Sequence, residues 1–133
     1  MKLLSREEIL NAKDMRFEEV HTPEWGEGVG VRVHVLSGVE RDAWEERIVR
    51  DRQKNSTGYL INIRARLTVM TVRDESGKPL FTDADIELLG KKSAAALDRV
   101  FSAAMRINRL SPDEIKELEG NSEPAPSGGP GSN

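Results

Sequence analysis

Residues 17–35 read FEEVHTPEWGEGVGVRVHV, and this stretch decides which fold class the chain can adopt. Valine occupies every second position from Val29 to Val35, and this alternation predicts a strand with one apolar face. Residues 17–22 are also extended in character, and Pro23 with the glycines after it predicts a turn between the two runs. We therefore expect a β-hairpin at about residues 16–36. A lone hairpin is marginally stable in water, so its valine face must rest on helices or on another subunit.

Helix-start signals flank the hairpin on both sides. Ser5 with Glu8, and Ser37 with Glu40, have the spacing of a capping box, in which side chains satisfy the first backbone N–H groups of a helix. The first pair predicts a brief N-terminal helix. The second predicts a longer helix through Arg52, with apolar residues at helical spacing at Val39, Ala43, Trp44 and Ile48.

Residues 59–73 carry two apolar faces. One consists of Leu60, Ile63, Leu67 and Met70, and the other of Ile61, Ala65, Val69 and Val72. This pattern is typical of a helix that is covered on most sides, so we predict a helix from Tyr59 to Arg73. The β-branched residues between 68 and 72 leave a strand open as an alternative for the second half.

The remaining segments predict more helix. Residues 74–79 are a turn by composition, and Thr82 with Asp85 caps a short helix through Leu89 that Gly90 stops. Ser93 opens a longer helix, whose apolar stripe of Leu97, Val100, Phe101 and Ala104 makes it the best core helix.

The C-terminal part changes character. Ser111 and Pro112 start a very polar helix that ends at Gly120, and residues 121–133 are rich in Pro, Gly and Ser, as in a flexible tail. The predicted fold class is α+β and mostly α. A single small domain at residues 1–120 has one N-terminal hairpin (about 16–36) packed on several short helices (about 37–120), and a disordered tail follows at 121–133.

Composition narrows the function classes. The 133 residues suit one domain, and aromatic residues are only 5%, so the core is thin and burial against a partner could add to it. A net charge of −3 gives no long-range attraction for nucleic acid or anionic membranes. The chain has no cysteine, no signal-peptide pattern and no apolar run of membrane-spanning length. We expect a protein that is neither exported nor embedded and that resides in a reducing cytoplasm.

No motif for catalysis stands out. The glycines at 26, 28 and 30 precede a strand, whereas a phosphate-binding loop needs a helix N-terminus after it. His21 and His34 lie on the two predicted strands, but two histidines are weak support for a metal or acid–base site. We therefore expect no catalytic, cofactor or metal residues, and a protein that is not an enzyme.

The cations lie among apolar or acidic neighbours. The basic residues between 41 and 54 alternate with acids, which is typical of a solvated helix face rather than a phosphate-binding one. Arg64, Arg66 and Arg73 decorate an otherwise apolar segment. They either form ion pairs with a partner or reach past the core edge into water with their stems packed.

Residues 74–101, DESGKPLFTDADIELLGKKSAAALDRVF, resemble the C-terminal half of tail assembly chaperones from long-tailed, siphovirus-like bacteriophages. Further matching stretches precede them. These are the Leu-Leu-Ser opening at residues 3–5, Pro-Glu-Trp-Gly at 23–26, Leu-Ser-Gly-Val-Glu-Arg-Asp-Ala at 36–43, and Ile-Arg-Ala-Arg-Leu at 63–67. Together they span most of residues 1–120. The resemblance rests on their order and spacing, since none is a catalytic signature.

The resemblance implies a role in virion assembly. Such chaperones bind the long tape measure protein and keep it soluble in the host cytoplasm while tail-tube subunits polymerise around it. They are then released and are absent from the mature virion, and many exist in a second, frameshifted length. Several copies on one client would favour a homo-oligomer. The chain itself leaves two alternatives open, a structural virion component such as a head-to-tail connector and a small nucleic-acid-binding regulator.

Candidate contact residues follow from an apolar client, which needs helices with apolar faces. The segments at 59–73 and 93–110 offer such faces. The candidate partner-binding residues are Trp25, Arg64, Leu67, Met70, Phe101 and Met105. A core role is the stronger interpretation for Phe101 and for Trp44.

Overall fold

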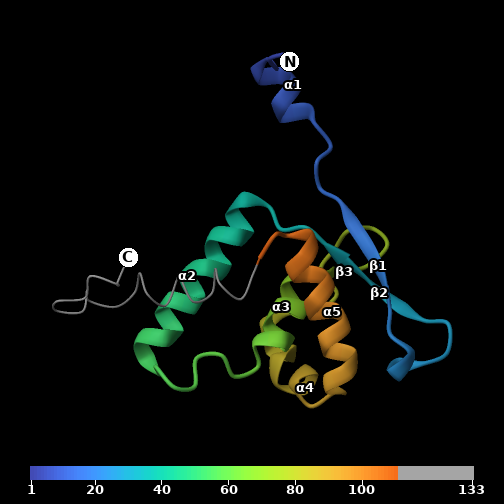
Figure 1. Ribbon diagram of the computed structural model, residues 1–133, viewed down its shortest axis with the longest axis vertical. Coiled ribbons are helices and arrows are strands. Elements are labelled where there is room, and N and C mark those ends of the chain that lie inside the picture. Colours follow the sequence, from blue (N-terminus) through green and yellow to red (C-terminus); the bar gives the residue numbers. More distant parts are fainter. Residues whose placement is uncertain (111–133) are drawn as a thin grey trace.

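The sheet is built from the predicted hairpin and one further strand. In the computed structural model, which describes residues 1–110, strands β1 (Phe17–His21), β2 (Gly30–His34) and β3 (Val72–Arg73) form an antiparallel sheet in the order β1-β2-β3. Figure 1 shows the sheet on one side of the helices. The fold class is confirmed, and the hairpin is part of a three-stranded sheet.

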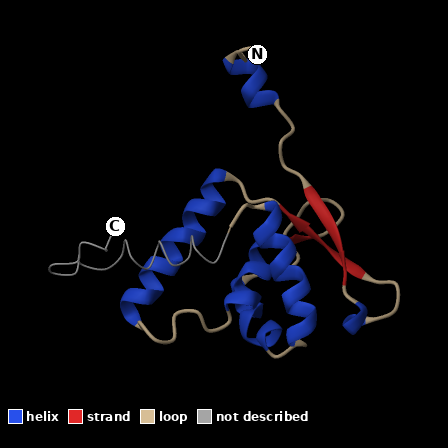
Figure 2. Cartoon of the chain, viewed as in Figure 1, coloured by secondary structure: helices blue, strands red, loops and turns tan. Residues whose placement is uncertain are grey.

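Five α-helices and two short 3-10 helices complete the described part of the chain. They are α1 (Arg6–Asn11), η1 (Pro23–Trp25), α2 (Gly38–Lys54), α3 (Ile63–Thr71), η2 (Asp83–Asp85), α4 (Ile86–Gly90) and α5 (Ala94–Ile107). Both predicted capping boxes are confirmed: Ser5 caps α1 with Glu8, and Ser37 caps α2 with Glu40. Ser93 caps α5, as predicted. Figure 2 shows that more of the chain is helical than extended in strands.

The predicted helix at 59–73 is wrong at both ends. Residues 59–62 form turns, and α3 begins only at Ile63 because Asn62 has a left-handed backbone with φ 62°. A helix cannot run through such a residue, and Asn tolerates this conformation better than most. At the other end, Val72 leaves the helix with extended angles and enters β3. The strand alternative therefore applies to Val72 and Arg73, while residues 68–71 are helical.

Strand register fixes which side chains share a face of the sheet. Val20 pairs with Val31, and Val33 pairs with both Glu18 and Val72. Directly paired residues point to the same side, so the valines form one apolar face. This face packs on α5: Val33 and Val100 are fully buried in one cluster, and Glu18 bonds Arg106 on α5. The prediction that the valine face rests on helices is confirmed.

The core has two parts. The main cluster joins the sheet, α2, α3 and α5, and its most buried large side chains are Val33, Trp44, Ile48, Leu67, Val72 and Val100. A second cluster joins α3, α4 and α5 through Ala65, Val69, Ile86, Leu89 and Leu97. Helix α3 therefore has both faces buried, as its two apolar faces predicted.

The predicted turn at 74–79 is present. The Asp74 carboxylate accepts hydrogen bonds from the N–H groups of Ser76 and Lys78 at 2.8 and 3.0 Å, and Gly77 has a positive φ of 87°. The predicted helix at 111–120 and the predicted tail at 121–133 lie outside the described residues.

Candidate partner-binding surfaces

The six candidate partner-binding residues lie on three elements. Trp25 ends η1, the residues Arg64, Leu67 and Met70 lie on α3, and Phe101 and Met105 lie on α5. Helices α3 and α5 pack side by side, so five of the six belong to one helix pair. The six side chains differ widely in solvent exposure, and this exposure decides which of them a partner protein could contact.

Leu67 and Met105 are buried. Leu67 has no exposed surface and Met105 has 8%, and both belong to the main core cluster. Met70 and Phe101 are half-buried and pack against the same cluster. These four side chains act first as core residues, which was the stronger interpretation for Phe101. A partner could reach Leu67 or Met105 only if the core opened.

The three arginines of the α3 segment form ion pairs within the chain. Arg64, half exposed, pairs with Asp98 on α5, and its guanidinium lies 6.0 Å from the centre of the Phe101 ring. Arg73 bonds Glu40 on α2 at 2.7 Å. Arg66 bonds Asp51 at 3.0 Å. Of the three, Arg64 keeps the most accessible side chain and so stays the best candidate for a partner contact.

A small groove lies beside Arg64 at one end of the helix pair. Its volume is about 160 Å³, and its lining includes Leu60, Arg64, Lys92 and Leu97. Asn62 and Gly90 meet in its wall: a Cβ at Gly90 would lie 2.4 Å from Asn62 Oδ1, so a larger residue at position 90 would require the Asn62 side chain to move. We call this the helix-end groove. Leu60 at its rim is 39% exposed and the adjacent Ile61 is 64% exposed.

Sequence reasoning assigned Leu60 and Ile61 to buried helix faces and so missed them as surface residues. Their exposure follows from the turns at 59–62, which break the helical periodicity before Asn62. The polar residues 54–58 were the one signal in the sequence for this exposure. They predict an interruption between two helices, but they do not predict at which residue the second helix begins.

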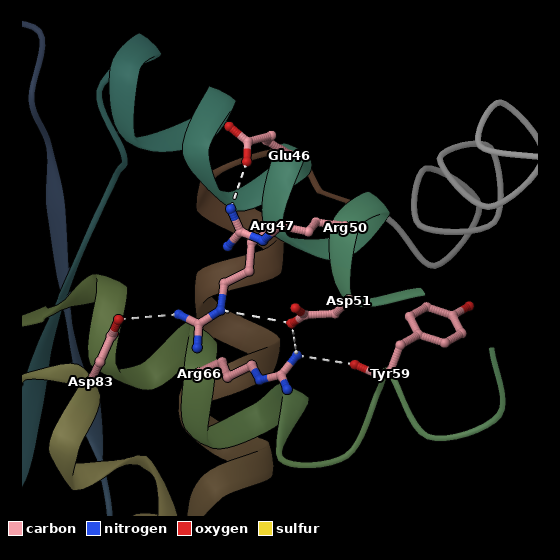
Figure 3. Close-up of polar contacts among 7 residues, drawn as sticks. All are labelled: Glu46, Arg47, Arg50, Asp51, Tyr59, Arg66 and Asp83. Carbon is pink, nitrogen blue, oxygen red and sulfur yellow. Dashed lines mark hydrogen bonds and ion pairs between the residues drawn. The ribbon is translucent and has the colours of Figure 1, made fainter. Parts of the chain in front are cut away.

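A network of ion pairs holds the segment that carries Leu60 and Ile61. Figure 3 shows Arg47 and Arg66 converging on the Asp51 carboxylate, at 3.8 and 3.0 Å. Arg47 also reaches Asp83 of η2 at 3.4 Å, and Arg66 donates to the Tyr59 carbonyl at 3.0 Å. The network therefore ties α2, α3 and η2 to the start of the turn segment, which gives the helix-end groove a fixed rim.

Trp25 lies at the tip of the hairpin. The preceding Glu24 accepts two hydrogen bonds from Arg99 Nε on α5, both 3.1 Å, and this contact lowers the pKa of the Glu24 carboxyl. Gly26 follows with φ 148°, a conformation that L side chains rarely adopt. The tip is thus fixed to α5, and the Trp25 side chain is about one-third exposed (36%).

A larger groove lies on the sheet, between the hairpin and the turn after β3. It has a volume of about 610 Å³, and its lining includes Val29, Gly30, Arg32, Glu75 and Leu80. Val29 and Leu80 are about half exposed, at 44% and 52%. We call this the sheet groove. Its lining joins apolar side chains to charged side chains of both signs.

The two histidines do not form a site together. His34 pairs with Phe17 in the sheet and His21 pairs with Gly30, so they lie at opposite ends of the hairpin. Burial, together with the nearby Arg73 and Arg32, lowers the pKa of His34. Among residues 1–110, no group of three His, Asp or Glu side chains could hold a metal ion.

No helix within the described part of the chain is long and apolar enough to cross a membrane.

Comparisons with known proteins point in one direction. Residues 5–120 match a family model described as "Phage tail assembly chaperone". The fold is similar to that of a solved protein titled "Structure of bacteriophage HK97 tail assembly chaperone", with a TM-score of 0.51 and 20% identity. That match covers 80% of this chain and 92% of the other, and at this identity it shows a shared fold alone. No curated protein sequence matches the chain.

Proposed function

Because the chain belongs to the phage tail assembly chaperone family, we propose that it binds the tape measure protein of its phage without catalysing a reaction. The complex keeps the tape measure protein soluble in the host cytoplasm while tail-tube subunits are recruited around it. The chain is then released and is absent from the finished virion.

The observation that carries this proposal is the pair Leu60 and Ile61, which expose large apolar side chains beside the helix-end groove. Exposed apolar residues next to a groove mark a binding surface more often than isolated ones do. A long, apolar, helical client can lay such side chains into the groove in the manner of a helix in a groove. The ion-pair network of Asp51 supports this mode because it fixes the rim before the client arrives.

The charges beside the groove suit a client with acidic residues flanking its apolar face. Lys92 is exposed, and Arg64 is half exposed even though it pairs with Asp98. An acidic client side chain can share the Arg64 guanidinium, which has five N–H donors. Trp25 at the hairpin tip is a second candidate contact.

Co-expression with the tape measure protein encoded nearest to the chain tests the proposal. We expect the tape measure protein to stay soluble and to co-elute with the chain in size-exclusion chromatography. The double variant Leu60→Ser with Ile61→Ser should reduce the soluble tape measure protein several-fold. Leu88→Ser on α4 is the matched control, since Leu88 is 66% exposed and lies outside the lining of the groove.

Two results would count against it. If the tape measure protein precipitates equally with and without the chain, the chain is not its chaperone. If the double variant and the Leu88→Ser control solubilise the client alike, the client binds elsewhere on the chain.

A further inference from the structure

A third groove lies where the segment before β1, the start of α2 and the end of α5 meet. In Figure 1 the end of α5, in orange, lies beside the link between β2 and α2. The volume of the groove is about 280 Å³. Its charged lining consists of three arginines and one acid, which are Arg16, Arg41, Arg109 and Asp14. Its apolar lining consists of Met15, Val35, Leu36 and Ile107. We call this the basic groove.

Two arginines of the basic groove have no acid partner among residues 1–110. Arg41 pairs with Glu45 at 3.4 Å. Arg16 and Arg109 are exposed and form no ion pair with a described residue, although Asp14 lines the same groove. Three arginines and one aspartate give the lining a net charge of +2, whereas the whole chain carries −3. The basic groove is therefore complementary to an acidic occupant.

The backbone of Arg109 indicates that its side chain has a role. Its φ is 53°, in the left-handed region that glycine usually occupies after a helix. The Leu110 N–H donates to the Met105 carbonyl at 2.8 Å, which ends α5 and turns the chain. An L residue is strained in this conformation and glycine is not, and such strain is concentrated at functional sites.

The chain itself contains an acidic segment directly after this turn. Leu110 is the last residue that the structure describes, and 23 residues follow it in the chain of 133. Residues 113–119 read DEIKELE. Their four acids and one lysine give a net charge of −3, opposite in sign to that of the basic groove.

We propose that residues 111–120 dock in the basic groove of the same copy. Their carboxylates pair with Arg16 and Arg109 in charge-assisted hydrogen bonds. The sequence predicts a helix at 111–120, and a helix places Ile115 and Leu118 on one face because they are three positions apart. This face covers the apolar lining. The docked segment thereby links the segment before β1 to α2 and α5.

The short connection favours this segment over an acidic partner in solution. Residues 107–109 line the basic groove, so residue 111 starts at its edge. Asp113 lies three positions after Leu110 and can reach about 10 Å from it. A segment on so short a linker has an effective concentration in the millimolar range, at about which free partners would have to compete.

Engineered cysteines test this contact in the full chain, which has no natural cysteine. Met15 is 45% exposed in the basic groove, so Met15→Cys with Leu118→Cys should form a disulfide within one copy. Mass spectrometry of the monomer band on a non-reducing gel detects it. Leu88→Cys with Leu118→Cys is the control and should stay reduced, since Leu88 is exposed on α4 and lies outside the basic groove. A disulfide between two copies, equal yields in the two variants, or no disulfide overturns the proposal.

Proteolysis gives a test that is independent of cysteine geometry. Endoproteinase Lys-C cuts after lysine, and Lys116 lies in the docking segment. Cleavage there should be several-fold faster when Arg16→Gln is combined with Arg109→Gly than in the natural chain. Glycine suits the left-handed backbone at position 109, so the circular dichroism should not change. Arg6→Gln with Arg50→Gln is the control and should leave the cleavage rate unchanged, because both residues lie outside the basic groove.

An unchanged cleavage rate in the variant of Arg16 and Arg109, or an equal rise in the control, overturns the proposal. The tape measure protein is absent from both tests. Their outcome is therefore independent of whether the proposed function holds.

Discussion

Asn108 makes more connections between elements than its place at the end of α5 would suggest. Its Oδ1 accepts a hydrogen bond of 2.6 Å from the Leu36 N–H, and its Nδ2 donates to the Ala104 carbonyl at 3.0 Å. The residue is 7% exposed. Asn108 therefore supplies a hydrogen-bond acceptor to the backbone between β2 and α2, although it lies 72 positions further along the chain.

We predict that Asn108→Ala lowers the free energy of unfolding by about 1–3 kcal/mol, because the Leu36 N–H loses its acceptor inside a partly buried site. Urea denaturation followed by tryptophan fluorescence measures this. Asn11→Ala at the exposed end of α1 is the control and should change stability by less than about 0.5 kcal/mol. If the two variants lowered the free energy of unfolding equally, the hydrogen bond from Leu36 to Asn108 would not stabilise the segment between β2 and α2.

His34 should make stability depend on pH. Burial, with Arg73 and Arg32 nearby, holds the pKa of this imidazole below its usual value of about 6.5, while Glu40 acts in the opposite direction. The unfolded chain then binds the proton more readily than the folded chain. Stability is therefore full above about pH 6.5 and falls as the pH drops from there toward the folded pKa.

Thermal melting between pH 5 and pH 8 checks this prediction. His34→Gln should flatten the dependence near pH 6. A His34→Gln variant that keeps the full slope would assign the dependence to another group.

At the scale of single elements, the close approach of β1 and β2 depends on Gly30. A Cβ at this position would lie 2.2 Å from the Val20 carbonyl oxygen, which is backbone and cannot move aside cheaply. The alternation of valines predicted a hairpin here, but not how closely the strands pass.

We predict that Gly30→Ala destabilises the protein by about 1–3 kcal/mol through strain in the hairpin. Gly38→Ala at the start of α2 is the matched control, since a Cβ there meets nothing within 4 Å. It should be neutral or stabilising by less than about 1 kcal/mol. Chemical denaturation of both variants gives the comparison, and a neutral Gly30→Ala would contradict the observed strand approach.

Asp51 is the centre of the network that ties α2 to α3. Replacing it by Asn leaves Arg47 and Arg66 without their shared carboxylate, and both arginines are less than one-third exposed. We expect a loss of about 1–3 kcal/mol in the free energy of unfolding. Glu46→Gln is the control, since the Glu46–Arg50 pair is an exposed i,i+4 pair worth about 0.3–0.5 kcal/mol.

Hydrogen exchange of the backbone amides tests the Asp51→Asn variant at the level of one segment. The amides of residues 59–62 should exchange faster in Asp51→Asn than in Glu46→Gln, because Arg66 also holds the Tyr59 carbonyl. Unchanged exchange there would mean that the network does not fix the rim of the helix-end groove.

Local signals in the sequence were enough to predict most elements. The capping boxes at Ser5 and Ser37 and the valine alternation each act within a few residues, so they could be predicted from the chain. The start of α3 and strand β3 could not, because they depend on the left-handed Asn62 and on pairing between Val72 and Val33, 39 positions apart.

At the scale of the whole molecule, surfaces were harder to predict than the core. The apolar faces of α3 and α5 suggested client contacts, but the fold uses most of them in its own two clusters. Tertiary packing decides which side chains are exposed to solvent. The helical spacing of apolar residues predicts an apolar face, but it does not predict whether that face is buried in the core or binds a partner. The large exposed apolar residues lie elsewhere. Several lie between residues 1 and 17, Leu60 and Ile61 lie in the turns at 59–62, and the others are Trp25, Val29, Val39, Leu80 and Leu88.

The central claim is that the chain acts on the tape measure protein during assembly and then leaves. Quantitative mass spectrometry of infected-cell lysate and purified particles, for the phage with and without the gene for this chain, tests it most directly. The account predicts that the chain is abundant in the soluble lysate and absent from particles. Without it, the tape measure protein should move to the insoluble fraction, and heads should form without tails. A chain that is retained in mature particles, or a tape measure protein that stays soluble without it, would contradict the account.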